Sequence, residues 1–82
     1  MANTVNLKII SPQSTIFNQN ITSMVCTSVK GKLGILPGHA HMLASLKPSN
    51  VEIKNEKGSG LQVTISGGLL EVHPDKIIIY TE

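Results

Sequence analysis

The sequence contains no arginine and no tryptophan, and its only aromatic residues besides histidine are Phe17 and Tyr80. Base-edge readout of nucleic acids depends largely on the bidentate guanidinium fork, and single-strand binding depends on aromatic stacking. All seven basic residues are lysines, and the formal net charge is only +2 although the pI is about 8.9. The composition therefore argues against nucleic acid as a partner.

Long apolar runs are also absent, and none approaches the roughly 18 residues that a membrane-spanning helix needs. Residues 1–6 lack a basic stretch followed by an apolar run, so the sequence signals neither secretion nor organelle import. Any association with a membrane is therefore expected to go through a partner. The single cysteine, Cys26, lies in an apolar stretch and cannot form an internal disulfide, so we expect a buried, inert thiol.

No pattern of catalytic residues is present. His39 and His41 are two residues apart, so on a strand they would project from one face and could share a metal ion. Zinc usually takes four ligands, and His73, Cys26 and the scattered carboxylates show no ligand spacing. We therefore assign no catalytic, metal or cofactor residue and expect no enzyme, with a small metal-dependent enzyme built on the histidine pair as a rival interpretation.

What the 82 residues do contain is short apolar runs separated by proline and glycine, which is typical of an all-β sandwich or barrel. A chain of this length makes one domain, residues 1–82, stable by a narrow margin. Alternating apolar and polar residues predict strands at 5–9, 51–54 and 61–66, with turns at 55–60 and 73–76. A final strand is expected at 77–81, and because it is apolar on both faces we expect it to be covered on both sides. Gly67 and Gly68 fall where one strand gives way to the next and permit the positive φ of a bulge or a sharp bend.

Two segments are ambiguous. Apolar residues in 13–30 have helical spacing, but the β-branched residues and serines there favour strands near 15–17 and 21–29. Residues 39–47 would also suit one face of a helix. For that segment the sequence pattern alone does not distinguish a helix from a strand.

The stretch Gly31–Ala40 combines three glycines, a proline and several large apolar residues. Turn geometry alone explains the glycines. Alternation, however, sends Leu33 and Ile35 to one side of a strand and Leu36 to the other, so they cannot all enter one face of a small sandwich. Some of this apolar surface is therefore expected to be covered by another protein.

Together with the later block Ile65–Val72, this stretch resembles the N-terminal β-sandwich domain of the epsilon subunit of the rotary, proton-driven ATP synthase. The resemblance runs from the Val5 strand to Thr81. It implies an all-β sandwich or flattened barrel of about nine or ten short, mostly antiparallel strands. It also implies that 39–47 is a strand ending at Lys47, before Pro48. The family commonly continues into a C-terminal helical hairpin, which this sequence does not contain.

The resemblance implies a non-catalytic rotor subunit that binds the gamma subunit and rests on the loops of the c-ring, coupling proton transport to ATP synthesis. By position, Gly31, Lys32, Leu33 and Gly34 would meet the c-ring, and Ser11, His39, Met42 and Ala44 would meet gamma. The implied location is peripheral, at the cytoplasmic face of the bacterial inner membrane. The alternative is a freestanding small β-barrel binding module.

Three residues depart from the family pattern. Lys32 stands where the family often has an acidic residue, and two unit charges about 4 Å apart interact by roughly 1–4 kcal/mol. The contact with the ring is therefore expected to be reorganised. His41 replaces a usual proline and Ser49 a usual glycine, both in loops or at strand ends.

Overall fold

The computed structural model describes residues 3–38 and 40–82, and in them it contains seven strands and no helix. The strands are β1 (Val5–Ile10), β2 (Thr15–Ile21), β3 (Ser23–Ser28), β4 (Gly31–Ile35), β5 (Met42–Lys54), β6 (Gly60–His73) and β7 (Lys76–Tyr80). Within these ranges no helix is long and apolar enough to cross a membrane.

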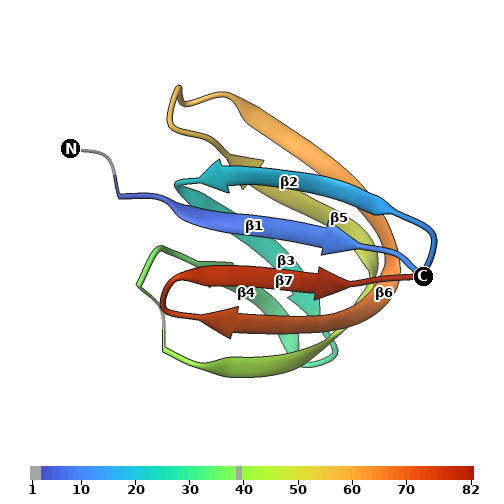
Figure 1. Cartoon of the computed structure of the whole chain (residues 1–82). Helices are drawn as coiled ribbons and strands as arrows, with labels where there is room; N and C mark the ends of the chain where they lie inside the picture. The colour runs from blue at the N-terminus through green and yellow to red at the C-terminus, as the bar shows by residue number, and fades with distance from the viewer. Residues whose placement is uncertain (1–2, 39) are drawn as a thin grey trace.

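All seven strands belong to one sheet with the order β2-β1-β7-β6-β5-β3-β4. Every neighbouring pair is antiparallel except β1 with β7. The long strands β5 and β6 curve together and carry the sheet from a front layer of β1, β2 and β7 to a rear layer of β3 and β4 (Figure 1). The sheet stays open, with β2 and β4 at its edges, so the predicted all-β fold is confirmed in its sandwich form.

The predicted strand number, about nine or ten, was too high. Two breaks that we expected at Pro48 and at Gly67–Gly68 are absent, because β5 and β6 run through them in unbroken register. Proline is tolerated inside β5 because Pro48 lies where the pairing of β3 with β5 is interrupted, between the pairs Ser28–Leu46 and Val25–Glu52. The strand predicted near 15–17 extends to Ile21, and β3 begins at Ser23 rather than Ile21.

The bend of β6 depends on two consecutive glycines with positive φ, 101° at Gly67 and 142° at Gly68. A β-carbon on Gly68 would lie 1.9 Å from the carbonyl oxygen of Tyr80. The end of the chain is fixed at the same place, since the buried Thr81 hydroxyl donates a 2.7 Å hydrogen bond to the Gly67 carbonyl. These glycines make the predicted bend, without a register shift.

Both layers direct their alternate apolar residues into one shared core. Val5, Leu7 and Ile9 of β1 are buried at every second position, as the alternation predicted. The rest of the core comes from the other strands: Ile21, Met24, Cys26, Ile35, Leu46, Val51, Ile53, Ile65, Leu70, Val72, Ile77 and Ile79. Outward-facing positions of the same strands are thus left to solvent or to partners.

We expect Gly68→Ala to prevent folding or to lower the free energy of unfolding by more than about 4 kcal/mol, because the methyl group would collide with rigid backbone. Gly31→Ala is the matched control. Gly31 also has a positive φ, 126°, but a β-carbon added there would meet no neighbouring atom within 4 Å, so backbone strain of about 1–2 kcal/mol is the only cost. Urea denaturation of both variants checks the difference, and equal losses would contradict it.

Cys26 is fully buried, as predicted, and burial raises the pKa of its thiol from 9.0 to about 11. Between these two pH values the unfolded chain holds fewer protons than the folded chain. The free energy of unfolding should therefore fall as the pH rises from 9 to 11, by up to about 2–3 kcal/mol. Urea titrations across this pH range in the wild type and in Cys26→Ala isolate the contribution of the thiol, since the two chains share every other ionisable group. Identical pH profiles would refute the assignment.

Candidate partner-binding surfaces

The β3–β4 hairpin carries the four residues predicted to meet the c-ring. Its two-residue turn is held by the Ser28 hydroxyl, which donates to the Gly31 carbonyl and accepts from the Lys30 N–H, at 2.8 and 3.1 Å. In β4, Leu33 pairs with the buried Cys26 and packs against the core, whereas Lys32 is exposed. The hairpin therefore presents Lys32 and Gly34 outward and keeps Leu33 turned inward.

A groove opens between this hairpin and the first residues of β5. Its volume is about 380 Å³, and its lining is mostly apolar. It is lined by Ser28, Val29, Lys30, Leu33, Met42, Leu43, Ala44 and Ser45. Sequence reasoning assigned Leu33 to one partner and Met42 and Ala44 to another, and the structure brings all three to the same groove.

Leu36, just beyond β4, is 62% exposed, whereas Ile35 is 1% exposed. The expectation that the isolated chain cannot bury all the apolar residues of this segment is therefore confirmed. His39, predicted to contact gamma, lies outside the described residues. Leu36 follows the last residue of β4, on the connection to the start of β5 at Met42.

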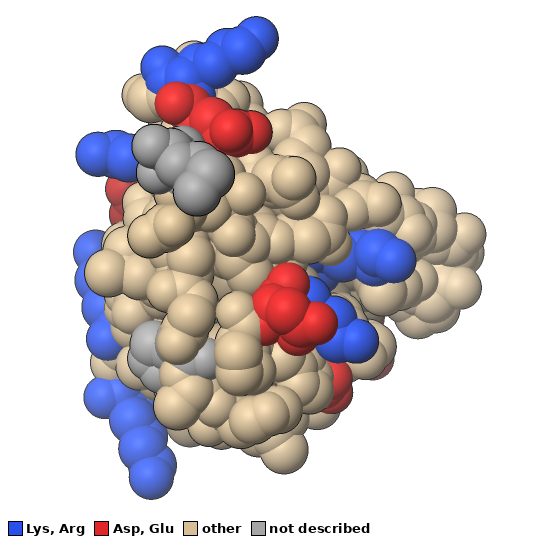
Figure 2. Space-filling model, turned by 60° about the vertical axis from the view of Figure 1, so that its left-hand side comes forward, with Lys and Arg blue, Asp and Glu red and all other residues tan. Residues whose placement is uncertain are grey.

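A second apolar surface covers the outer face of the front layer. It consists of Leu43, Leu69, Ile78 and Tyr80, which we call the apolar band. Leu69 lies directly opposite Tyr80 across β6 and β7, and Glu71 lies opposite both Leu43 and Ile78, so the four side chains share one face. Leu43 is 68% exposed and Tyr80 41%. In the view of Figure 2, lysines follow one margin, other charged side chains are scattered, and uncharged residues cover the rest of the visible surface.

Sequence reasoning missed the apolar band. It took the final strand, apolar on both faces, as one covered on both sides, but here its outer side is free of any other element of the described chain. The detectable signal was an apolar residue out of phase with the core: Leu43 beside Met42, Leu69 beside Leu70, and Tyr80 beside Ile79. Such a residue marks an outer face that a second protein can cover.

Ser11, the remaining residue predicted to contact gamma, lies in the β1–β2 turn. Its hydroxyl accepts from the Ser14 N–H and donates to the Ser14 carbonyl, at 3.2 and 3.1 Å, so it closes the turn. β7 and β6 separate β1 from β5 in the sheet, and Ser11 is not among the residues that line the groove. Three residues of the apolar band, Leu69, Ile78 and Tyr80, lie on these intervening strands, and the fourth, Leu43, lies on β5.

The structure also gathers two histidines that are 32 residues apart in sequence. The rings of His41 and His73 meet edge to face with their centroids 4.9 Å apart, and His73 Nε2 lies 2.6 Å from Glu71 Oε1. Across 3–38 and 40–82, no group of three or more potential ligands could hold a metal ion. This cluster borders the apolar band, and only strand pairing could have revealed it.

The family model described as "ATP synthase, Delta/Epsilon chain, beta-sandwich domain" matches residues 4–82. The chain belongs to this family. The resemblance inferred from the glycine-containing blocks is confirmed, and the domain is a non-catalytic part of ATP synthase.

Two solved structures of ATP synthases contain chains with a fold similar to that of this chain. A chain of the Euglena gracilis mitochondrial ATP synthase, in a structure of OSCP, F1 and c-ring, has a TM-score of 0.90 and 25% identity over 96% of this chain and 51% of that chain. A chain of the Tetrahymena thermophila mitochondrial ATP synthase central stalk and c-ring has a TM-score of 0.78 and covers 94% of this chain and 62% of that one. The identity there is 18%, so this second match shows the fold alone. The chain thus spans roughly half to three-fifths of the length of these neighbours.

We predict that Leu36→Asp changes the free energy of unfolding by less than about 0.5 kcal/mol, because its side chain is mostly in solvent. Leu33→Asp should cost about 2 kcal/mol or more, because it places a charge against the core. Thermal denaturation of the two variants of the isolated chain measures the difference. A large loss with Leu36→Asp would show that this side chain belongs to the core.

Proposed function

We propose that this chain is a rotor subunit in the central stalk of a proton-translocating ATP synthase, where it binds the gamma subunit and the c-ring and couples proton transport to ATP synthesis. The observation that carries the proposal is the combination of family membership with two apolar surfaces, the groove and the apolar band, that the chain leaves uncovered. Uncovered apolar area of this kind marks a site of protein association.

The mechanical requirement of such a subunit is stiffness, because torque passes through it only if its contact surfaces keep their relative positions. A single hydrogen-bonded sheet supplies this, since both surfaces lie on strands that share one close-packed core. β5 contributes residues to both surfaces, with Met42 and Ala44 in the groove and Leu43 in both. No loop has to transmit force between them.

We propose that gamma covers the apolar band and the groove, contacting Met42 and Ala44, with Ser11 at the far margin of the same contact. His39 belongs to this proposal by its position in the sequence. The c-ring loops would meet the outward side of the β3–β4 hairpin at Gly31, Lys32 and Gly34, with Leu33 supporting the hairpin from inside. Membrane association goes through these partners.

The location follows from the same assignment: peripheral to the membrane, as part of the stalk. Both structural neighbours come from mitochondrial complexes. Placement at the cytoplasmic face of a bacterial inner membrane stays a prediction. The alternative of a freestanding β-barrel module receives no support from the sheet, whose edge strands β2 and β4 are not joined.

The test is binding of the chain to the gamma subunit of the same complex, measured by titration calorimetry. We expect Leu43→Asp to weaken binding at least about tenfold, because it would bury an unpaired carboxylate at the contact, and to leave unfolding unchanged within about 0.5 kcal/mol. Gln62→Asp adds the same charge to an exposed position on the outer face of the rear layer and should bind normally. Absence of wild-type binding at tens of micromolar, with the chain folded, would refute the proposed function.

A further inference from the structure

A carboxylate lies in the middle of the apolar band, on Glu71. This residue of β6 is directly opposite Leu43 of β5 on one side and Ile78 of β7 on the other. Its side chain is 29% exposed, so most of it is already withdrawn from water in the free chain. A partner that covers the apolar band would remove the remaining exposure, and burial of an unpaired carboxylate is strongly unfavourable.

The group positioned to neutralise this carboxylate is the imidazole of His73. Its Nε2 lies 2.6 Å from Glu71 Oε1. The two residues are two positions apart on β6, so both side chains project from the outer face. The ring of His41 packs edge to face against the ring of His73, with the centroids 4.9 Å apart, and so restricts the orientation of that ring.

The charged residues around this pair do not replace the histidine. Lys76 of β7 lies opposite His73, and Asp75 precedes it in the turn after β6. Lys8 of β1 lies in the same row of the sheet as Glu71 but two strands away, which is about 10 Å. In the part of the chain that the structure describes, neither lysine forms an ion pair with Glu71.

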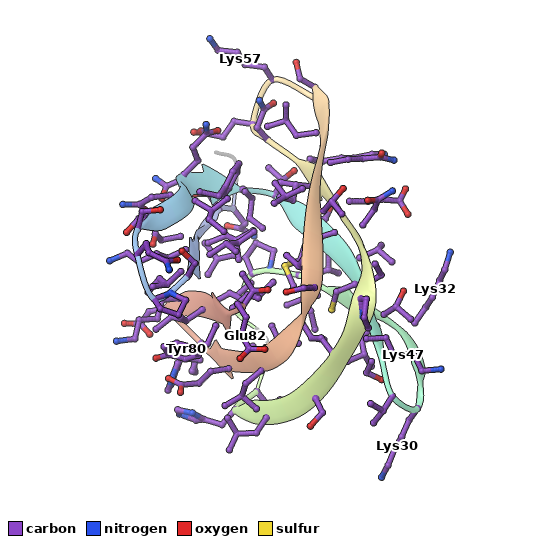
Figure 3. All side chains as sticks on the ribbon, turned by 90° about the vertical axis from the view of Figure 1, so that its right-hand side faces the viewer. Lys30, Lys32, Lys47, Lys57, Tyr80 and Glu82 are labelled. Carbon is purple, nitrogen blue, oxygen red and sulfur yellow. The ribbon has the colours of Figure 1, made fainter. Side chains whose placement is uncertain are left out.

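The lysines of the rear layer are remote from the pair. Figure 3 shows Lys30, Lys32 and Lys47 across the molecule from Tyr80, which belongs to the same outer face as Glu71. Among residues 3–38 and 40–82, the Glu71 carboxylate therefore has one ionisable partner, and that partner is a histidine. Histidine is the side chain whose charge ordinarily changes between about pH 5 and 8.

Resting on the proposed function, we propose that the Glu71–His73 pair enters the contact with gamma carrying one proton, so that binding of gamma at neutral and alkaline pH takes up a proton from solvent. The bound pair is either a carboxylate with an imidazolium or a carboxylic acid with a neutral imidazole, and neither form has a net charge. Without that proton the same pair carries a charge of −1, which the apolar contact would have to bury.

Binding that takes up a proton becomes weaker as the pH rises. Below about pH 6 the free chain already holds the proton on histidine, so the affinity for gamma should be highest there and nearly independent of pH. Between about pH 6.5 and 8.5 the affinity should fall about tenfold, because the free pair loses its proton while the bound pair retains it.

Titration calorimetry of the chain with the purified gamma subunit, from about pH 6 to 8.5, tests this coupling. Buffers of different ionisation enthalpy measure the protons taken up, which we expect to number about 0.5–1 at pH 7.5. Glu71→Gln removes the charge and keeps a hydrogen-bonding side chain beside His73. It should bind gamma about tenfold more tightly than the wild type at pH 8.5 and show little pH dependence, whereas a merely structural role of Glu71 would make the variant bind more weakly.

Three further variants assign the proton. His73→Gln should bind at least about tenfold more weakly than the wild type near pH 6, with little pH dependence, because nothing neutralises Glu71. His41→Gln should keep the wild-type pH dependence, since the carboxylate and its partner both remain. Glu56→Gln, the control for Glu71→Gln, removes an exposed carboxylate in the turn between β5 and β6 and should bind like the wild type at each pH. Urea denaturation at both ends of the pH range checks that each variant is folded.

The outcomes separate this proposal from the rotor assignment. Wild-type binding to gamma that does not depend on pH would overturn the proton coupling and leave the rotor assignment intact. Weaker binding by Glu71→Gln at pH 8.5 would also overturn it, because a cation of gamma would then pair with the carboxylate. A pH dependence that persists in His73→Gln would overturn it in favour of another titrating group. Failure of the folded wild-type chain to bind gamma at any pH in this range would overturn both proposals.

Discussion

The close approach of Gly68 to the Tyr80 carbonyl is the constraint on which the rest of the structure depends. A β-carbon at this position would lie 1.9 Å from that oxygen, so only glycine lets β6 bend here without losing its pairing with β5 and β7. The bend turns one continuous seven-stranded sheet into two facing layers. The core, the groove at the layer margin and the apolar band on the outer face all follow from that turn, because each is built from strands that the bend brings into position.

In a small sandwich of this kind, apolar residues either fill the core or form surface that a partner can cover. Those directed inward, such as Leu7 and Ile79, fill the shared core and give the chain its stability. Those out of phase, such as Leu43 and Leu69, add nothing to the isolated fold and leave it with surface that another protein can cover. A chain of 82 residues has a narrow stability margin, so a permanent partner on this surface would also stabilise it by mass action. Stability and assembly are thus connected through the two faces of the same strands.

The charges are arranged differently from the apolar residues. Lys30, Lys32 and Lys47 lie on the rear layer and the apolar band lies on the front layer, so contacts made at the two places rely on different interactions. Apolar burial at the front gives a contact whose strength depends little on salt. The contact made by the lysines at the hairpin weakens as salt is added, because the Debye length is only about 8–10 Å at physiological ionic strength. The groove joins the two, with Leu33 and Met42 on its apolar lining and Lys30 at its rim. Rising ionic strength would therefore weaken the contact made by the lysines and leave the apolar contact nearly unchanged.

By itself the sequence determined which side chains enter the core, because alternation at period two is local: Val5, Leu7 and Ile9 were identifiable as one face without knowing what they pack against. It also determined the family, through glycines that only a bend or turn requires, and the surplus of apolar residues near Leu36. Only the tertiary structure decided that β5 passes through Pro48, that Leu33 shares a groove with Met42 and Ala44, and that His41 contacts His73. These features depend on register between strands distant in sequence. Register is set by the collective packing of the core, which no local pattern of residues contains.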